Sequence, residues 1–189
     1  IMILVPPILI STAINDINMI IDRSLASTLI TGSISALNYG NRLNDLILGI
    51  FITAITTVMF PTLSKNANKE NLDEFKKTIR YGINAIVLII LPATVGMIIL
   101  AEPIVRIAFE RGAFDSQATY MTAGAMIFYS LGLLGTALRT LLIKIYYSFQ
   151  DTRTPMIINI AINLLNVFGN YILIFGKFNL PALGVTGAG

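Results

Sequence analysis

Arg42 is the residue in this chain whose type and position most clearly imply chemistry. It lies within a mainly apolar segment that runs from Ala36 to about Phe60 and is long enough to cross a bilayer. A guanidinium in hydrocarbon costs roughly 2.5–3.5 kcal/mol on insertion scales. Such a side chain normally faces a water-filled cavity or a partner anion. The candidate chemistry is therefore recognition of an anionic group inside a membrane.

The neighbours of Arg42 extend this polar character along the segment. Asn38, Arg42 and Asp45 are spaced by four and three residues, which places them on one face of a helix. Two readings of Arg42 remain open: contact with a ligand in a cavity, or a structural ion pair with Asp45 or Asp22. Asn38 and Asn41 either line the cavity or join helices. Farther along the same face lie Gly49, Thr53 and Thr56.

Two further polar stripes have helical spacing. The first predicted span carries one that ends at Asp22, and the fifth carries one formed by asparagines. Arg139 lies within the fourth span, where it either faces the cavity or snorkels toward the membrane surface. The stripes are Ser11, Asn15, Asn18 and Asp22, and Asn159, Asn163, Asn166 and Asn170.

Composition points to a membrane protein. Of the 189 residues, 55% are hydrophobic and 12% are charged, and the mean hydropathy is +0.77. Soluble domains carry about 25% charged residues. We therefore predict an all-α integral membrane protein. The absence of cysteine and histidine excludes disulfides, thiolate nucleophiles and histidine-based sites, and the lack of a glycine-rich phosphate loop argues against ATP hydrolysis.

The apolar segments predict about five complete transmembrane helices and the start of a sixth. We treat residues 1–189 as one bundle and expect it to be part of a longer protein. The predicted spans are 1–30, 35–63, 79–100, 117–149 and 155–175, with a sixth beginning at 183.

Two longer connections separate these spans. Ser64–Arg80 is hydrophilic and contains a capping-box pattern in which Asn71 is the N-cap and a glutamate follows three residues later. Ala101–Thr119 contains an amphipathic turn and then a loop, and Ser116 is the expected N-cap of the fourth span.

Smaller signals refine this reading. Pro92 and Gly96 predict a kink in the third span. Glu110, with the arginine and glycine that follow it, is interpreted as locking its loop, and that glycine, Gly112, permits a positive φ. Asp151 is expected to fix a short turn before the fifth span.

Basic residues concentrate on one side of the predicted bundle. That side carries seven and the other carries three, so the richer side should face the cytoplasm. The run from Lys65 to Arg80 is interpreted as a topology signal that touches anionic headgroups rather than as a partner site. The seven are Lys65, Lys69, Lys76, Lys77, Arg80, Lys144 and Arg153; the three are Arg106, Arg111 and Lys177.

Three stretches occur in a fixed order with characteristic spacings. They are Asn38-Tyr39-Gly40-Asn41-Arg42-Leu43, Phe109-Glu110-Arg111-Gly112-Ala113-Phe114, and Tyr146-Tyr147-Ser148-Phe149-Gln150-Asp151-Thr152-Arg153-Thr154-Pro155. Together they resemble the MurJ (MviN) family, lipid II flippases of the multidrug/oligosaccharidyl-lipid/polysaccharide exporter superfamily. The resemblance covers essentially the whole chain. It implies that the chain forms most of the C-terminal lobe of a two-lobe transporter, without the N-terminal lobe and the last helices.

The resemblance also implies a function. The family flips lipid II, an undecaprenyl-pyrophosphate-linked peptidoglycan precursor, across the bacterial cytoplasmic (inner) membrane by alternating access, and it is not enzymatic. Lipid II, membrane lipids and cell-wall synthesis proteins are the implied partners, and nucleic acid is not. The implied substrate-binding residues are Arg42, Asn38, Asn41, Asp45 and Arg139, with Arg42 facing the pyrophosphate.

A sodium site is a further implication of the resemblance. Asp22, Asn166 and Asn170 would provide the hard oxygen ligands that a hard cation prefers. Asn170 stands where some members carry an acidic residue, so the site has less negative charge here. The alternative is that these asparagines form interhelical hydrogen bonds.

Two other functions are compatible with the sequence. One is export of a different polyprenyl-linked glycan or of drugs, although a cavity for cationic drugs would require carboxylates rather than Arg42. The other is a non-transporting membrane scaffold, which would tolerate removal of the charges along the polar faces.

Overall fold

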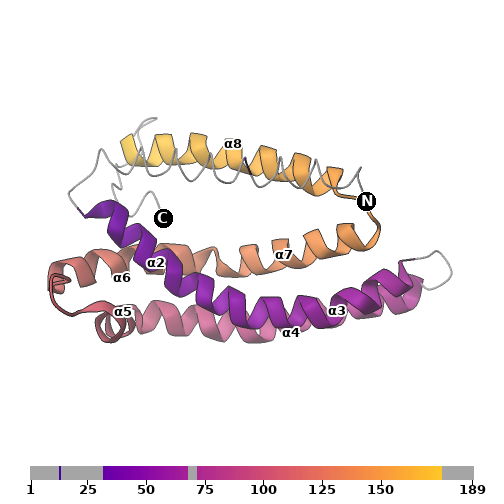
Figure 1. Ribbon diagram of the computed structural model, residues 1–189, viewed down its shortest axis with the longest axis horizontal. Coiled ribbons are helices and arrows are strands. Elements are labelled where there is room, and N and C mark those ends of the chain that lie inside the picture. The colour runs from indigo at the N-terminus through magenta and orange to yellow at the C-terminus, as the bar shows by residue number, and fades with distance from the viewer. Residues whose placement is uncertain (1–12, 14–31, 68–71, 176–189) are drawn as a thin grey trace.

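The computed structural model describes residue 13, residues 32–67 and residues 72–175, with the backbone alone at 33 and at 166–175. Within these ranges the chain is helical apart from short turns, which confirms the all-α prediction. Long helices lie side by side, and the short helix α5 lies across one end (Figure 1). The elements are α2 (Ser33–Ile47), the π-helix η1 (Leu48–Ile52), α3 (Thr53–Asn66), α4 (Leu72–Ile99), α5 (Ala101–Phe109), α6 (Ser116–Leu131), α7 (Leu133–Ser148) and α8 (Arg153–Phe175).

The predicted membrane spans correspond to these helices. α2, η1 and α3 join into one span, Ile34–Asn66, and α4 forms another. α6 and α7 together are long and apolar enough to form a third. α8 covers the fifth predicted span, 155–175. Apart from residue 13, the first predicted span lies outside the described residues, and so does the sixth.

The ends of the bundle agree with the predicted sidedness. The end of α3, the start of α4 and the α7–α8 turn lie at one end, whereas α5 and the turn after it lie at the other (Figure 1). The connections that are rich in basic residues therefore share one end. This arrangement is what the positive-inside rule requires if that end faces the cytoplasm.

α4 begins earlier than the span predicted from residue 79. Its first residue is Leu72, directly after Asn71, the predicted N-cap, which lies outside the described residues. Asp73 and Glu74 occupy its first turn, where negative charge favours the helix dipole. The hydrophilic residues before the membrane segment are therefore helical rather than part of a loop.

The predicted amphipathic turn after α4 is wrong in extent, because these residues form a full helix, α5. Arg106 supports it by pairing with Glu102 at 2.8 Å and with Glu110 at 3.2 Å, each four residues away. Pairs at this spacing stabilise a helix. The sequence did suggest amphipathicity but not the length.

Aspartates fix two of the turns. Asp115, not the predicted Ser116, is the N-cap of α6, and its Oδ1 accepts a 2.9 Å hydrogen bond from the backbone N–H of Ala118. A carboxylate satisfies the free N–H groups and also complements the helix dipole. Asp151 fixes the turn before α8, as predicted, by accepting from the backbone N–H groups of Arg153 and Thr154 at 3.0 Å.

Two spans are irregular. The fourth predicted span bends by 47° at Gly132, which separates α6 from α7. The second is continuous but contains the π-helical turn η1. Pro92 and Gly96 lie inside α4, which continues through both.

Apolar side chains form two main clusters along the bundle. The inner cluster, near the α3–α4 end, and the outer cluster, near α5, are bridged by Ile47, which packs against both. The inner cluster consists of Ile52, Ile86, Ile90, Leu133, Ala137 and Leu141. The outer cluster consists of Met97, Ala101, Val105, Ala123 and Met126.

Candidate functional site

α2 has a buried face and an exposed polar face. Gly40 and Asn44 are buried on the side that packs against α6. Asn38, Arg42 and Asp45 are exposed. The polar face predicted from the spacing therefore exists and does not pack into the described part of the bundle.

The exposed face contains one internal hydrogen bond. Asn41 Nδ2 donates to Asp45 Oδ2 at 3.0 Å, one helical turn away. Among the described residues Arg42 forms no ion pair, and the predicted alternative with Asp45 is not observed. The other predicted ion-pair partner, Asp22, lies outside the described residues. Within those residues, the guanidinium is left for water or an external anion.

Asn44 is a polar residue of α2 that the sequence reasoning missed. Its Nδ2 lies 3.2 Å from the carbonyl oxygen of Gly40 and 3.4 Å from that of Met126 on α6. Its Oδ1 accepts a 3.0 Å hydrogen bond from Ser130 Oγ. Asn44 therefore fixes the rotation of α2 against α6, which keeps Arg42 on the opposite face. The spacing of four residues from Gly40 was the signal that could have found it.

Arg139 on α7 has a partner of its own. Its guanidinium donates to Asn159 Oδ1 on α8, and Asn159 is buried. Asn163 Nδ2 donates back to the carbonyl oxygen of Asn159 at 2.9 Å. The first two asparagines of the α8 stripe thus take part in hydrogen bonding near the α7–α8 contact. Arg139 is therefore engaged by a neutral side chain on α8.

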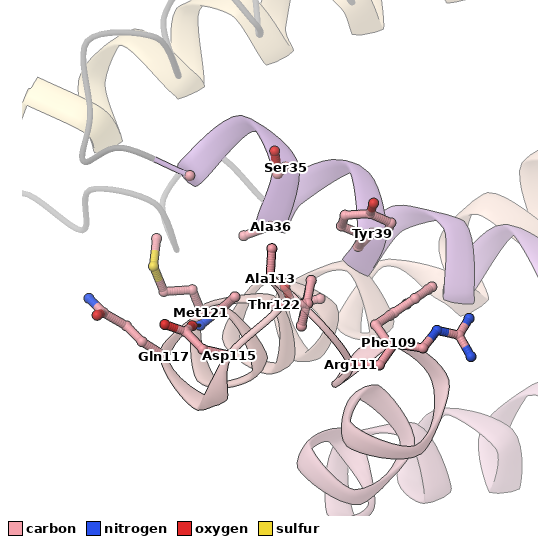
Figure 2. A pocket seen from close by; sticks show the side chains of 13 residues that line it. Ser35, Ala36, Tyr39, Phe109, Arg111, Ala113, Asp115, Gln117, Met121 and Thr122 are labelled. Atoms are coloured by element: carbon pink, nitrogen blue, oxygen red, sulfur yellow. Dashed lines mark hydrogen bonds between the residues drawn. The ribbon is translucent and has the colours of Figure 1, made fainter.

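A hollow of about 880 Å³ lies beside α2 at the α5 end. Residues of α2, Ala36 and Tyr39 among them, line one side of this hollow, and the turn between α5 and α6 lines the other (Figure 2). The Tyr39 ring lies 4.7 Å from that of Phe109 and 5.5 Å from that of Phe114. Arg111 lines the hollow, but its guanidinium points away from it (Figure 2). The lining of the hollow thus combines aromatic, hydroxyl and small side chains with the polar side chains of Asp115 and Gln117.

Glu110 secures the turn after α5. Its Oε2 accepts hydrogen bonds from Arg106 Nε at 3.2 Å and from Thr119 Oγ1 on α6 at 2.8 Å. Gly112 has a φ of 61°, a conformation that favours glycine. Both observations fit the predicted role of this stretch in locking its turn, and the absence of a substrate contact here stays a prediction.

The comparisons with known proteins agree with the geometry. A family model described as "Lipid II flippase MurJ" matches residues 1–187. The chain belongs to the lipid II flippase MurJ family. The name of this family describes a flippase, which moves its cargo without changing a covalent bond, and the apolar helices of the chain are those of a multi-pass membrane protein.

Individual members of the MurJ family are similar over most of this chain. A probable lipid II flippase MurJ from Vibrio cholerae is 37% identical over 164 residues, which cover 83% of this chain and 31% of that protein. A probable lipid II flippase MurJ from Haemophilus influenzae is 35% identical over 179 residues, which cover 88% of this chain and 35% of that protein. A solved structure of the lipid II flippase MurJ in an inward closed conformation matches with a TM-score of 0.79 and 27% identity, over 94% of this chain and 36% of that one. The chain spans about a third of the length of these relatives.

The sodium ligands predicted from the MurJ resemblance cannot be assembled from the described side chains. Asp22 lies outside the described residues, and Asn166 and Asn170 are placed on α8 by their backbone alone. Among the described side chains, no group of three acidic residues could hold a metal ion. A sodium site therefore stays a prediction.

Proposed function

We propose that this chain is part of a flippase that moves lipid II from the cytoplasmic to the outer leaflet of the bacterial cytoplasmic membrane. The observation that carries the proposal is Arg42. This permanent cation lies in a membrane-spanning helix, is exposed, and forms no ion pair among the described residues. Its cost in hydrocarbon is offset if it meets an anion in a polar cavity.

The pyrophosphate that links the sugar to the lipid is the anion we assign to Arg42. A guanidinium binds phosphate oxygens through paired, charge-assisted hydrogen bonds and does not lose its proton. The Asn41–Asp45 pair keeps a carboxylate one turn away engaged in a hydrogen bond, which leaves Arg42 free for the ligand. Asn38, on the same face, is suited to contact polar groups beside the phosphates.

Transport in this proposal requires alternating exposure of the polar face and no covalent step. The cavity would open first to the cytoplasm, receive the headgroup at Arg42, and then open outward. The N-terminal lobe of the two-lobe transporter would form the other wall of the cavity. Arg139, held by Asn159, contributes positive potential from α7. Cell-wall synthesis proteins are proposed as partners of the whole protein.

Sodium remains part of the proposal as a coupling ion. α8 carries Asn166 and Asn170 one helical turn apart, and amide and carboxylate oxygens are suitable ligands for a hard cation. Asp22 would complete the set from the first span.

The proposal is tested by genetic rescue. The full-length parent protein should restore growth to bacteria depleted of their own lipid II flippase, and Arg42→Ala should fail at equal membrane levels. Arg111→Ala is the matched control, because its guanidinium lies in a turn outside the spans. Rescue by Arg42→Ala would refute the pyrophosphate contact while leaving the transport function. Failure of the wild type, when present in the membrane, would favour export of another cargo or a scaffold.

A further inference from the structure

Three helices of the bundle each contain an irregularity where they pass from the inner cluster to the outer cluster. In the second span, η1 replaces regular α-helix at Leu48–Ile52. In α4, Pro92 lies between Ile90 of the inner cluster and Met97 of the outer cluster. In the fourth span, the 47° bend lies at Gly132, between Met126 of the outer cluster and Leu133 of the inner cluster.

At Pro92 the boundary lacks one backbone hydrogen bond. Pro92 has no N–H, so the carbonyl of Leu88 lacks its helical donor. Thr94 Oγ1, close by, is buried and makes no hydrogen bond in the described part of the chain. At the end of η1, the Thr56 hydroxyl donates a 2.8 Å hydrogen bond to the carbonyl oxygen of Ile52. A side chain thus supplements the backbone hydrogen bonds of the π-helical turn. Bending α4 at Pro92 therefore breaks one hydrogen bond fewer than bending a regular helix.

Each side of the boundary is held together by its own contacts. On the outer side, Asn44 links α2 to α6 through Met126 and Ser130, and the Glu110–Thr119 hydrogen bond ties the end of α5 to α6. We call α2, α5, α6 and the end of α4 after Pro92 the outer body.

The inner side is held together in the same way. Gly82 of α4 lies against Met59 of α3 and Leu141 of α7, and Lys144 of α7 lies over the Phe60 ring, 5.8 Å from its centroid. We call α3, α7 and the part of α4 before Pro92 the inner body. Ile47 is the residue that packs against the clusters of both bodies.

We propose that the bundle bends at this boundary, so that the outer body rotates on the inner body about η1, Pro92 and Gly132. The inference goes beyond the proposed transport, because it describes a motion of this chain whatever its cargo. Arg42 lies six residues to the outer side of η1, about 9 Å along the helix, and Arg139 lies seven residues to the inner side of Gly132, about 10 Å. Rotation at the boundary changes the separation of these two cations. An anion that contacts both would thus favour one bend angle.

The motion is measurable by spin-label distances in the full-length protein carrying no other cysteine. Labels at Tyr120 on α6 and Val58 on α3, both exposed, span the boundary. Tyr120 lies twelve residues from Gly132, an arm of about 18 Å. A bend change of about 20° moves it by about 6 Å. Labels at Leu72 and Leu88, both exposed on α4 before Pro92, report the inner body alone.

Two double variants provide the test and its control. Pro92→Ala with Gly132→Ala restores a donor and favours straight helix; an alanine Cβ fits at 132, where the nearest atom is the Tyr129 carbonyl oxygen at 3.5 Å. Pro61→Ala with Gly135→Ala makes the same changes within the inner body, where a Cβ at 135 meets nothing within 4 Å.

In wild type, the Tyr120–Val58 distances should spread several ångströms more widely than the Leu72–Leu88 distances. The Pro92/Gly132 variant should lose that extra spread, and the Pro61/Gly135 variant should keep it. The inference is overturned if the wild-type spread is equal for both pairs, if it survives in the Pro92/Gly132 variant, or if the control variant also removes it. The measurement uses no substrate, so its result is independent of the transport proposal.

Discussion

The contact between α2 and α6 depends on the absence of a side chain at Gly40. A Cβ built there would lie 3.0 Å from the backbone nitrogen of Met126, and 3.3 Å from both the Ala125 Cβ and the Thr122 carbonyl oxygen. These three atoms belong to the body of α6 rather than to flexible side-chain ends. Gly40→Ala should therefore push the two helices apart by a few tenths of an ångström.

The expected size follows from comparing two glycines. Forcing extra volume into a well-packed contact costs about 1–3 kcal/mol, whereas replacing a helical glycine with alanine gains about 1 kcal/mol. Gly135→Ala gains the helix propensity of alanine without a steric penalty, because a Cβ there meets nothing within 4 Å. The propensity terms cancel between the variants, so Gly40→Ala should be less stable than Gly135→Ala by about 1–3 kcal/mol.

The difference can be measured as the free energy of unfolding of the full-length protein in mixed micelles, titrated with a denaturing detergent and followed by circular dichroism. Gly82→Ala adds a second reference. Its Cβ would meet Met59 Cε, the mobile end of a side chain that can adopt another rotamer. Equal stability of the Gly40 and Gly135 variants would refute the conclusion that α2 and α6 meet through their backbones.

Two further predictions concern single side chains. Asn44→Ala removes the hydrogen bonds to Met126 and Ser130. It should lower the free energy of unfolding by about 1 kcal/mol, the size of such hydrogen bonds in membranes. An unchanged free energy of unfolding would show that Asn44 does not join the helices. Hydrogen bonds from the Thr154 hydroxyl and backbone N–H hold the pKa of Asp151 below its usual value. The stabilisation from Asp151 should be fully present above the carboxyl's unfolded-state pKa and be lost as the pH falls through its lower folded-state pKa. Asp151→Asn should remove this part of the pH dependence in unfolding titrations from about pH 6 to pH 2, and an identical profile would contradict the assignment.

The sequence predicted the architecture well because hydropathy is a strong signal in a membrane. The spans now seen as α4 and α8, and the polar face of α2, followed from segment length and from spacing alone. The irregularities did not follow. Gly132 is compatible with a straight or a bent membrane helix, and which one forms depends on packing against neighbouring helices. The residues of η1 are apolar whether the turn is α or π, so their pattern could not distinguish the two.

The candidate site was predicted in part for a related reason. Arg42 is identifiable because a charge in an apolar segment is costly whatever surrounds it. Asn44 is harder to identify from the sequence, because it lies beside a polar stripe and cannot be distinguished from that stripe unless the position of α6 is known. The partner of Arg139 is equally non-local: Asn159 lies twenty residues away on another helix.

The charges at the two ends of α4 limit how the protein can move in the membrane. The uncharged run from Tyr81 to Leu100 is about 30 Å long, which matches the hydrocarbon thickness of a bilayer. Arg80 directly precedes this run, and Glu102 follows it after Ala101, at the start of α5. Sliding the helix along the membrane normal would draw one of these charges into hydrocarbon, at roughly 2.5–3.5 kcal/mol for an arginine near the centre. An elevator-type movement of this bundle is therefore opposed in both directions, whereas tilting and bending leave both charges in water.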